Sequence, residues 1–89
     1  MVEVYCDFAH LNESFVRVFC EELQSEELVW HRDKRDRIVE VVSGEGWKFQ
    51  HDNEIPFELK RGMVFEIEAY SYHRILKGTK DLILRITEK

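Results

Sequence analysis

The sequence has 89 residues, 44% of them hydrophobic and 12% aromatic, with a formal net charge of −5 at pH 7. A chain of this length forms one domain, and its negative charge argues against duplex nucleic acid as a partner. It contains no run of ~20 apolar residues that could span a membrane, and its first residues, MVEVYCDF, lack the positive charge of a secretory signal. We therefore expect a cytoplasmic protein that binds neither nucleic acid nor a membrane.

Short segments of alternating polar and apolar residues follow one another along the chain. They are rich in β-branched and aromatic residues, which favours strands. We predict strands at residues 2–8, 14–20, 27–33, 37–43, 47–50, 56–59, 63–67, 72–76 and 81–87. Residues 12–28 fit helical spacing almost as well, but we interpret 14–20 as a strand. Short strands at intervals of about 8 to 12 residues indicate an all-β sandwich or barrel of antiparallel sheets.

The alternation also predicts which side chains face the interior. Val39 shares a face with Arg37, and both should point inward. In the segment 47–50, Trp47 and Phe49 lie on one face and Gln50 on the other. Hydrophobicity favours the aromatic residues inside. If Gln50 is inside instead, the aromatic side chains form an outer apolar surface that a partner subunit could cover.

The cysteines and two of the histidines have simple interpretations. Cys6 and Cys20 lack CxxC spacing, so we expect small buried side chains rather than a disulfide framework or a thiolate zinc site. His10 and His51 fall in or beside expected turns, where solvent should surround them.

A histidine and an aspartate stand two residues apart in the expected strand 27–33. His31 and Asp33 should project from one face, ~6–7 Å apart along the strand at ~3.3 Å per residue. Residues of this type suit metal binding or acid–base chemistry. An inert alternative pairs Asp33 with Arg37 at the barrel mouth, where such a surface pair contributes about 0 to 1 kcal/mol and implies no function.

Residues 25–78 resemble a minimal single-domain cupin, a family of small jelly-roll β-barrels. The first motif of the family is a glycine, five residues, H-x-H, three or four residues, a glutamate, six residues and a glycine. Its positions here hold Ser25, His31, Asp33, Arg37 and Gly44. The second motif is a glycine, five residues, P-x-G, two residues, a histidine, three residues and an asparagine. Its positions here hold Gly62, Glu68, Tyr70, His73 and Lys77.

The resemblance implies a site for one divalent metal, such as Fe, Mn, Ni or Zn. Its ligands would be His31, Asp33 and His73, the two-histidine, one-carboxylate set of many non-haem iron oxygenases. Arg37 replaces the usual glutamate ligand and cannot bind a metal, because a guanidinium has only donors. The resemblance therefore permits a metal-dependent oxygenase or isomerase without requiring one.

Two further functions remain open. In a metal-free sugar epimerase or isomerase, Asp33 would raise the basicity of His31, and the pair would be catalytic. In a non-catalytic module, the barrel would bind a small sugar or carboxylate. In each case Arg37, Gln50 and Tyr72 are candidate ligand-binding residues, with Arg37 suited to a carboxylate or phosphate. We also expect a homodimer, because so small a core stabilises a domain weakly.

Overall fold

A computed structural model describes the backbone of residues 5–11 and the full residues 14–20 and 29–89. These ranges contain strands and no helix, and thus no helix long and apolar enough to cross a bilayer. The strands are β1 (Tyr5–Leu11), β2 (Ser14–Phe19), β3 (Arg37–Ser43), β4 (Lys48–His51), β5 (Phe57–Glu58), β6 (Val64–Ile67), β7 (His73–Leu76) and β8 (Leu82–Glu88). The predicted all-β class is confirmed, and residues 14–19 form a strand rather than a helix.

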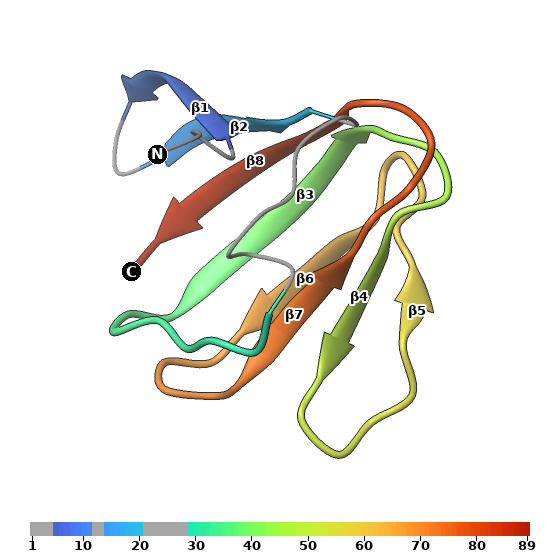
Figure 1. Cartoon of the computed structure of the whole chain (residues 1–89). Helices are drawn as coiled ribbons and strands as arrows, with labels where there is room; N and C mark the ends of the chain where they lie inside the picture. The colour runs from blue at the N-terminus through green and yellow to red at the C-terminus, as the bar shows by residue number, and fades with distance from the viewer. Residues whose placement is uncertain (1–4, 12–13, 21–28) are drawn as a thin grey trace.

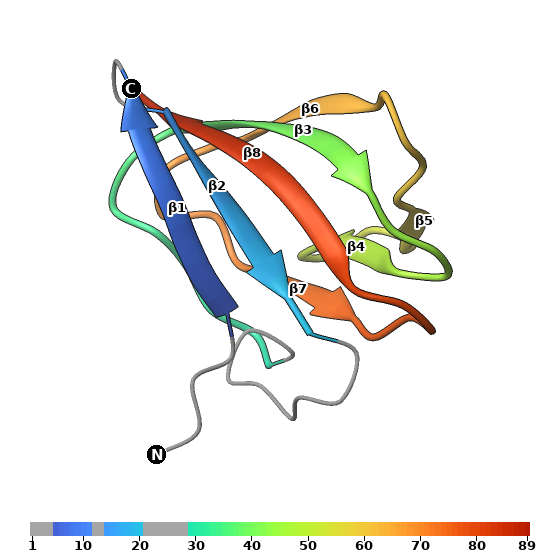
Figure 2. The same cartoon turned by 90° about the horizontal axis from the view of Figure 1, so that it is seen from above.

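The strands form two antiparallel sheets that face each other. The larger sheet has the order β1-β2-β8-β3-β6, and the smaller one has the order β5-β4-β7. Figure 1 shows the strands face on, and Figure 2 shows the smaller sheet lying on one side of the curved larger sheet. Because β8 pairs with both β2 and β3, the C-terminal strand lies in the middle of the larger sheet.

The core fills the space between the two sheets. Alternate residues of β2, β3 and β8 point into it, as strand geometry requires. Val39 is 2% exposed, which confirms the predicted inward face of β3. The buried hydrophobic residues are Phe15, Phe19, Val39, Val41, Trp47, Phe49, Leu59, Ile67, Ile75, Leu82, Leu84 and Ile86.

The aromatic residues of 47–50 lie inside, as hydrophobicity predicted. Trp47 and Phe49 are each 2% exposed, so they form no outer apolar surface for a partner subunit. Gln50 points away from the core, where it accepts a hydrogen bond from Arg74 Nε at 2.8 Å and donates one to the Glu54 carbonyl at 2.9 Å. The alternative interpretation, in which Gln50 lies inside, is therefore wrong for this strand.

The prediction of a strand at 27–33 is wrong for residues 29–33, the part of this segment that the structure describes. Within 29–33 only His31 pairs with a neighbour, as an isolated antiparallel bridge to His73. The Asp33 carbonyl instead accepts a hydrogen bond from the Tyr70 amide at 2.7 Å, so the chain leaves the sheet after one bridge. Residues 27 and 28 lie outside the described ranges.

Two expectations about single side chains are also wrong. Cys20 is exposed rather than buried. His51 is half-buried at the end of β4 and packs against Phe49 and Phe57, with ring centroids 4.8 and 6.1 Å apart. The side chains of Cys6 and His10 lie outside the described part of the chain.

Candidate metal centre

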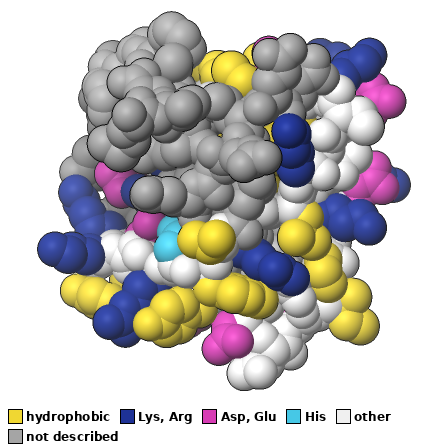
Figure 3. Space-filling model, viewed as in Figure 1, with side chains coloured by type: hydrophobic (Ala, Val, Ile, Leu, Met, Phe, Trp, Pro, Cys, Tyr) yellow, Lys and Arg dark blue, Asp and Glu magenta, His cyan; other side chains and the backbone are white. Residues whose placement is uncertain are grey.

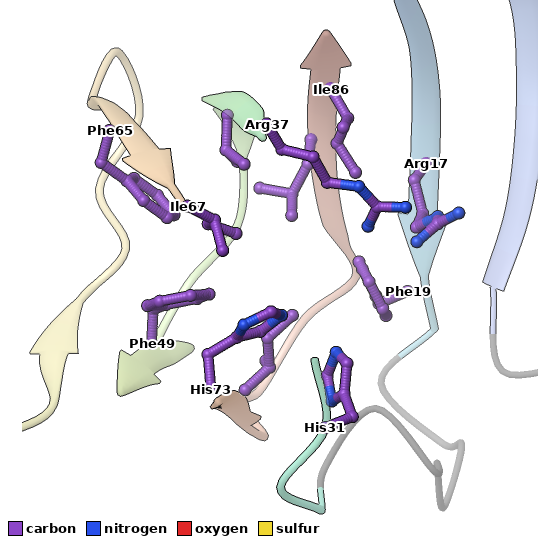
Figure 4. A pocket seen from close by; sticks show the side chains of 12 residues that line it. Arg17, Phe19, His31, Arg37, Phe49, Phe65, Ile67, His73 and Ile86 are labelled. Atoms are coloured by element: carbon purple, nitrogen blue, oxygen red, sulfur yellow. The ribbon is translucent and has the colours of Figure 1, made fainter. Parts of the chain in front are cut away.

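A cavity opens between the sheets. Its volume is about 360 Å³, counting the open mouth. Eight of its twelve described lining side chains are apolar, and the other four are Arg17, His31, Arg37 and His73. Figure 4 shows the two histidines close together, with the two arginines on another part of the wall. The polar groups are thus few and gathered in two places.

The backbone brings together two histidines that are 42 positions apart in the sequence. His31 and His73 exchange both amide hydrogen bonds of their bridge, at 3.0 and 2.9 Å. Cross-strand partners of this kind project from the same face, and the imidazole centroids are 4.4 Å apart, edge to face. His73 is 2% exposed and stacks on Phe49 at 5.4 Å, whereas His31 is half-buried. One histidine is therefore fixed in the core, and the other lies at the cavity mouth.

Both imidazole rings are held by backbone carbonyls. His31 Nδ1 lies 2.9 Å from the Val29 carbonyl oxygen, and His73 Nδ1 lies 3.0 Å from that of Ser71. A carbonyl oxygen can only accept, so each Nδ1 carries the proton and donates it. In a neutral ring the Nε2 lone pair is then the group left to bind a cation, which is the usual arrangement of a metal-binding histidine.

Asp33 brings a carboxylate to the same point. Its Oδ2 lies 3.2 Å from His73 Nε2 and 3.3 Å from Arg37 Nη1. Oδ2 is buried, yet within the described residues no group donates a well-directed hydrogen bond to it. A buried carboxylate oxygen and the lone pair of a neighbouring imidazole nitrogen repel each other. A proton or a metal ion between them would remove this repulsion.

The surroundings of Asp33 keep it ionised. Burial alone raises the pKa of its carboxyl. The close contact with His73 and the positive charges of Arg37, His73 and His31 outweigh burial, and the pKa lies below its ordinary value of 3.8. Asp33 is therefore a carboxylate at neutral pH, the form that a metal requires.

Arg37 belongs to this site through ion pairs. Besides Asp33 it contacts Glu88, whose Oε2 lies 3.0 Å from Nε and 2.9 Å from Nη2. Arg37 and Glu88 are cross-strand neighbours in the register of β3 and β8. The pairing of Asp33 with Arg37, expected for an inert mouth, thus exists, but it occurs together with the histidine contact.

The three candidate ligands fit a metal ion. One ligand atom from each of His31, Asp33 and His73 can be chosen so that all lie within 4.8 Å of one another. Ligands ~2.1 Å from an ion and at right angles to each other are ~3 Å apart, which the 3.2 Å between Asp33 and His73 matches. The donor set and the buried acceptor therefore suit a divalent transition metal, and small side-chain shifts would close the remaining gaps.

The other predicted ligand-binding residues lie elsewhere. Gln50 and Tyr72 are not among the residues that line the cavity. Tyr72 is 44% exposed, and the Arg32 guanidinium lies over its ring at 5.3 Å. In Figure 3 a small area of histidine surface is visible beside acidic and hydrophobic side chains.

Sequence reasoning missed two charged residues of the site. Arg17 lines the cavity and is 7% exposed. Its signal was present, because it alternates with the aromatic residues Phe15 and Phe19 and so shares their inward face. Glu88 had no such signal, since its pairing with Arg37 depends on the strand register.

Comparisons with known proteins identify the fold. No protein-family model and no curated protein matches this sequence. Among solved structures, a cupin-2 domain protein from Shewanella frigidimarina NCIMB 400 aligns with a TM-score of 0.68 and 18% identity, covering 96% of this chain and 79% of its own. A double-stranded β-helix protein from Klebsiella pneumoniae subsp. pneumoniae MGH 78578 has a TM-score of 0.63 and 19% identity, covering 93% and 72%.

A third similar structure is that of a much longer protein. A chain from the crystal structures of the DMSP lyases RdDddP and RnDddQII aligns with a TM-score of 0.69 and 20% identity, over 82% of this chain. This chain spans only 35% of the length of that protein. At such identities the similarity concerns the fold, and the chain has the cupin fold, a double-stranded β-helix.

Proposed function

We propose that the protein binds one divalent transition metal through the Nε2 atoms of His31 and His73 and the carboxylate of Asp33. The observation that carries this proposal is the convergence of these three side chains, with both Nδ1 atoms held by carbonyls and no hydrogen bond to Asp33 Oδ2 from the part of the chain that the structure describes. Three protein ligands leave coordination positions open for a small polar ligand, as catalytic metal sites do. The function we infer is metal-dependent binding of such a ligand. If the protein is an enzyme, this ligand would be the substrate of an oxygenase or isomerase reaction.

The chain's own residues prepare this site. The carbonyls of Val29 and Ser71 fix the orientation of the rings, and Phe49 holds His73 in place. The apolar walls of the cavity limit water around a bound ligand. A bound metal would supply Lewis acidity to polarise an oxygen of the ligand.

A metal-free acid–base function is the second candidate. It is favoured by the 3.2 Å contact between His73 Nε2 and Asp33 Oδ2. If Nε2 donates a proton to Asp33 while Nδ1 donates to Ser71, His73 is an imidazolium and acts as an acid. The acid–base pair would then be His73 with Asp33, instead of the pair of His31 and Asp33 expected from the sequence.

Metal content distinguishes the two. The protein would be purified without added metal or chelator, its metals measured by elemental analysis, and the depleted protein titrated with Zn²⁺, Mn²⁺ and Fe²⁺. We expect one metal ion per chain, lost in His73→Ala and Asp33→Asn. His51→Gln is the matched control, because His51 pairs with His73 in the β4–β7 register but lies outside the ligand set. Absence of any metal, or equal affinity in all three variants, would refute the proposal.

A further inference from the structure

We propose that the cavity binds a small, uncharged aromatic molecule that carries one oxygen group, and that this oxygen reaches the metal site. The inference rests on the proposed function and deepens it, because it names the class of ligand that the metal would serve. It depends on the walls of the cavity rather than on the three metal ligands.

One wall of the cavity is a row of aromatic rings that begins at the metal ligands. The ring centroids of His73 and Phe49 are 5.4 Å apart, and the two planes are nearly parallel, at 20°. Phe49 contacts Phe65 in turn, with ring centroids 4.8 Å apart. Figure 4 shows these three side chains on one side of the cavity and Phe19 on the other. A flat ring inside the cavity would therefore have aromatic contacts along its length.

The other apolar side chains of the cavity favour an apolar body for the ligand. They are aliphatic, and the described ones are Val39, Ile67, Ile75, Leu84 and Ile86. Ligand pockets are usually lined in this way, with a few polar groups that fix the orientation of the ligand. Here His31 and His73 lie at one end of the row of rings, so the oxygen of the ligand should point toward them.

The charged groups of the cavity are already engaged, which argues against an acidic ligand. Arg37 pairs with Asp33 Oδ2 at 3.3 Å and with Glu88 Oε2 at 2.9 Å. Arg17 has contacts of its own, including the Phe15 ring, whose centroid lies 5.0 Å from its guanidinium carbon. A carboxylate would have to compete with such partners and lose its hydration in an apolar cavity. The lining therefore favours an uncharged ligand.

The lining also argues against a sugar. A sugar carries several hydroxyl groups, and each one that is buried without a hydrogen-bonding partner weakens binding. Among the described residues that line the cavity there is no serine, threonine, asparagine, glutamine or carboxylate to provide such partners. A ligand with a single oxygen at the metal end avoids this cost.

The size of the cavity limits the ligand to about one ring. Its volume of about 360 Å³ includes the open mouth, and it lies near the lower limit of ligand pockets, which span roughly 300 to 1,000 Å³. A benzene ring with a one-carbon substituent is a ligand of this size.

The test compares ligands that share one ring and differ in a single group. Toluene has no oxygen, benzyl alcohol adds one hydroxyl and benzoate adds a charge, while glucose represents the sugars. Dissociation constants come from NMR titrations of the metal-free protein, and those of toluene and benzyl alcohol are measured again with Zn²⁺ bound. The variants are Phe65→Leu and, as the matched control, Phe57→Leu. Both side chains are partly buried and contact Phe49, but of the two only Phe65 lines the cavity.

We expect the metal-free protein to bind toluene and benzyl alcohol at least about tenfold more tightly than benzoate or glucose. Phe65→Leu should weaken both by about three- to tenfold, the loss of one aromatic contact, and Phe57→Leu by less than about twofold. Bound Zn²⁺ should tighten the binding of benzyl alcohol and leave that of toluene within about twofold. Should Phe65→Leu not fold, the wild-type protein still decides, because the protons of bound toluene must show NOEs to Ile86 and Phe65.

Binding of benzoate or glucose as tight as that of toluene overturns the inference. Unchanged toluene binding in a folded Phe65→Leu variant, or an absence of NOEs to Ile86, does the same. A benzyl alcohol affinity that Zn²⁺ raises no more than that of toluene overturns the placement of the oxygen at the metal.

The inference and the proposed function can fail separately. Zinc binding without binding of any aromatic probe would refute this inference and leave the proposed function intact. Phe65-dependent toluene binding to a protein that binds no metal would refute the proposed metal site and leave the aromatic site of the cavity intact.

Discussion

Removing the Arg37 charge should make metal binding tighter. Arg37 Nη1 lies 3.3 Å from Asp33 Oδ2, and a metal bound by that carboxylate would lie ~2 Å from it, so the two cations would be about 5 Å apart. The repulsion between a divalent ion and a unit charge at that distance is about 2 kcal/mol at the dielectric constant of water and about 7 kcal/mol at an effective value of 20.

Glu88 compensates part of this repulsion. Its carboxylate lies 2.9 Å from Arg37 Nη2, and both side chains keep some access to solvent. We therefore use the lower part of the range and predict that Arg37→Gln tightens Zn²⁺ binding by about 1.5 to 3 kcal/mol, roughly 10- to 100-fold. Glu88→Gln should act in the opposite direction, because it leaves the Arg37 charge uncompensated.

The assay is competition for Zn²⁺ with a chromophoric chelator at constant pH and ionic strength. Arg85→Gln is the control, since Arg85 pairs with Glu40 at 3.2 Å on the surface and its removal should leave zinc affinity unchanged. Weaker zinc binding in Arg37→Gln would refute the reasoning. That result would mean that Arg37 holds Asp33 in position for the metal rather than competing with it.

Three further predictions concern the fold and its surroundings. Because folding lowers the pKa of Asp33, its ionised form stabilises the protein above the unfolded pKa of about 3.9, and this contribution is lost as the pH falls through the lower folded value. Urea unfolding of the metal-free protein should therefore show an advantage over Asp33→Asn at pH 7 that shrinks toward pH 3, and a pH-independent difference would contradict this. Gly78→Ala should destabilise the fold by more than about 2 kcal/mol, because the added Cβ would overlap Trp47 and the Glu45 carbonyl. At Gly62 an added Cβ would meet no atom within 4 Å, so Gly62→Ala should cost about 1 kcal/mol through its φ of +91°. Equal losses of stability in the two variants on thermal unfolding would contradict this. Sedimentation should give twice the chain mass of 10.8 kDa, and a monomer mass would remove the homodimer prediction.

The sequence allowed the class of fold and most strands to be predicted because alternation is a local signal. The segment 37–43 forms β3 with the predicted bounds, and the inward face of Val39 follows from the same period of two. The segment at His31 could not be predicted in this way. One bridge to His73 satisfies its backbone, and the decision between strand and bend depends on the Tyr70 amide far along the chain.

Part of the candidate site could also be predicted from the sequence, and part could not. The convergence of His31, Asp33 and His73 was predicted through the family spacing, and the structure brings them together. Of the two orientations left open for Gln50 the outward one is correct, because hydrophobic burial of Phe49 determines the face of β4. Arg17 was missed because charged side chains are rarely buried, although its alternation with Phe15 and Phe19 indicates an inward face.

The central claim is that three side chains of this barrel bind one metal ion. Anomalous diffraction from crystals of the protein loaded with Zn²⁺, recorded on both sides of the zinc absorption edge, tests it most directly. We predict one peak per chain within bonding distance of His31, Asp33 and His73. A peak at another position, or no peak in crystals soaked in excess Zn²⁺, would contradict it.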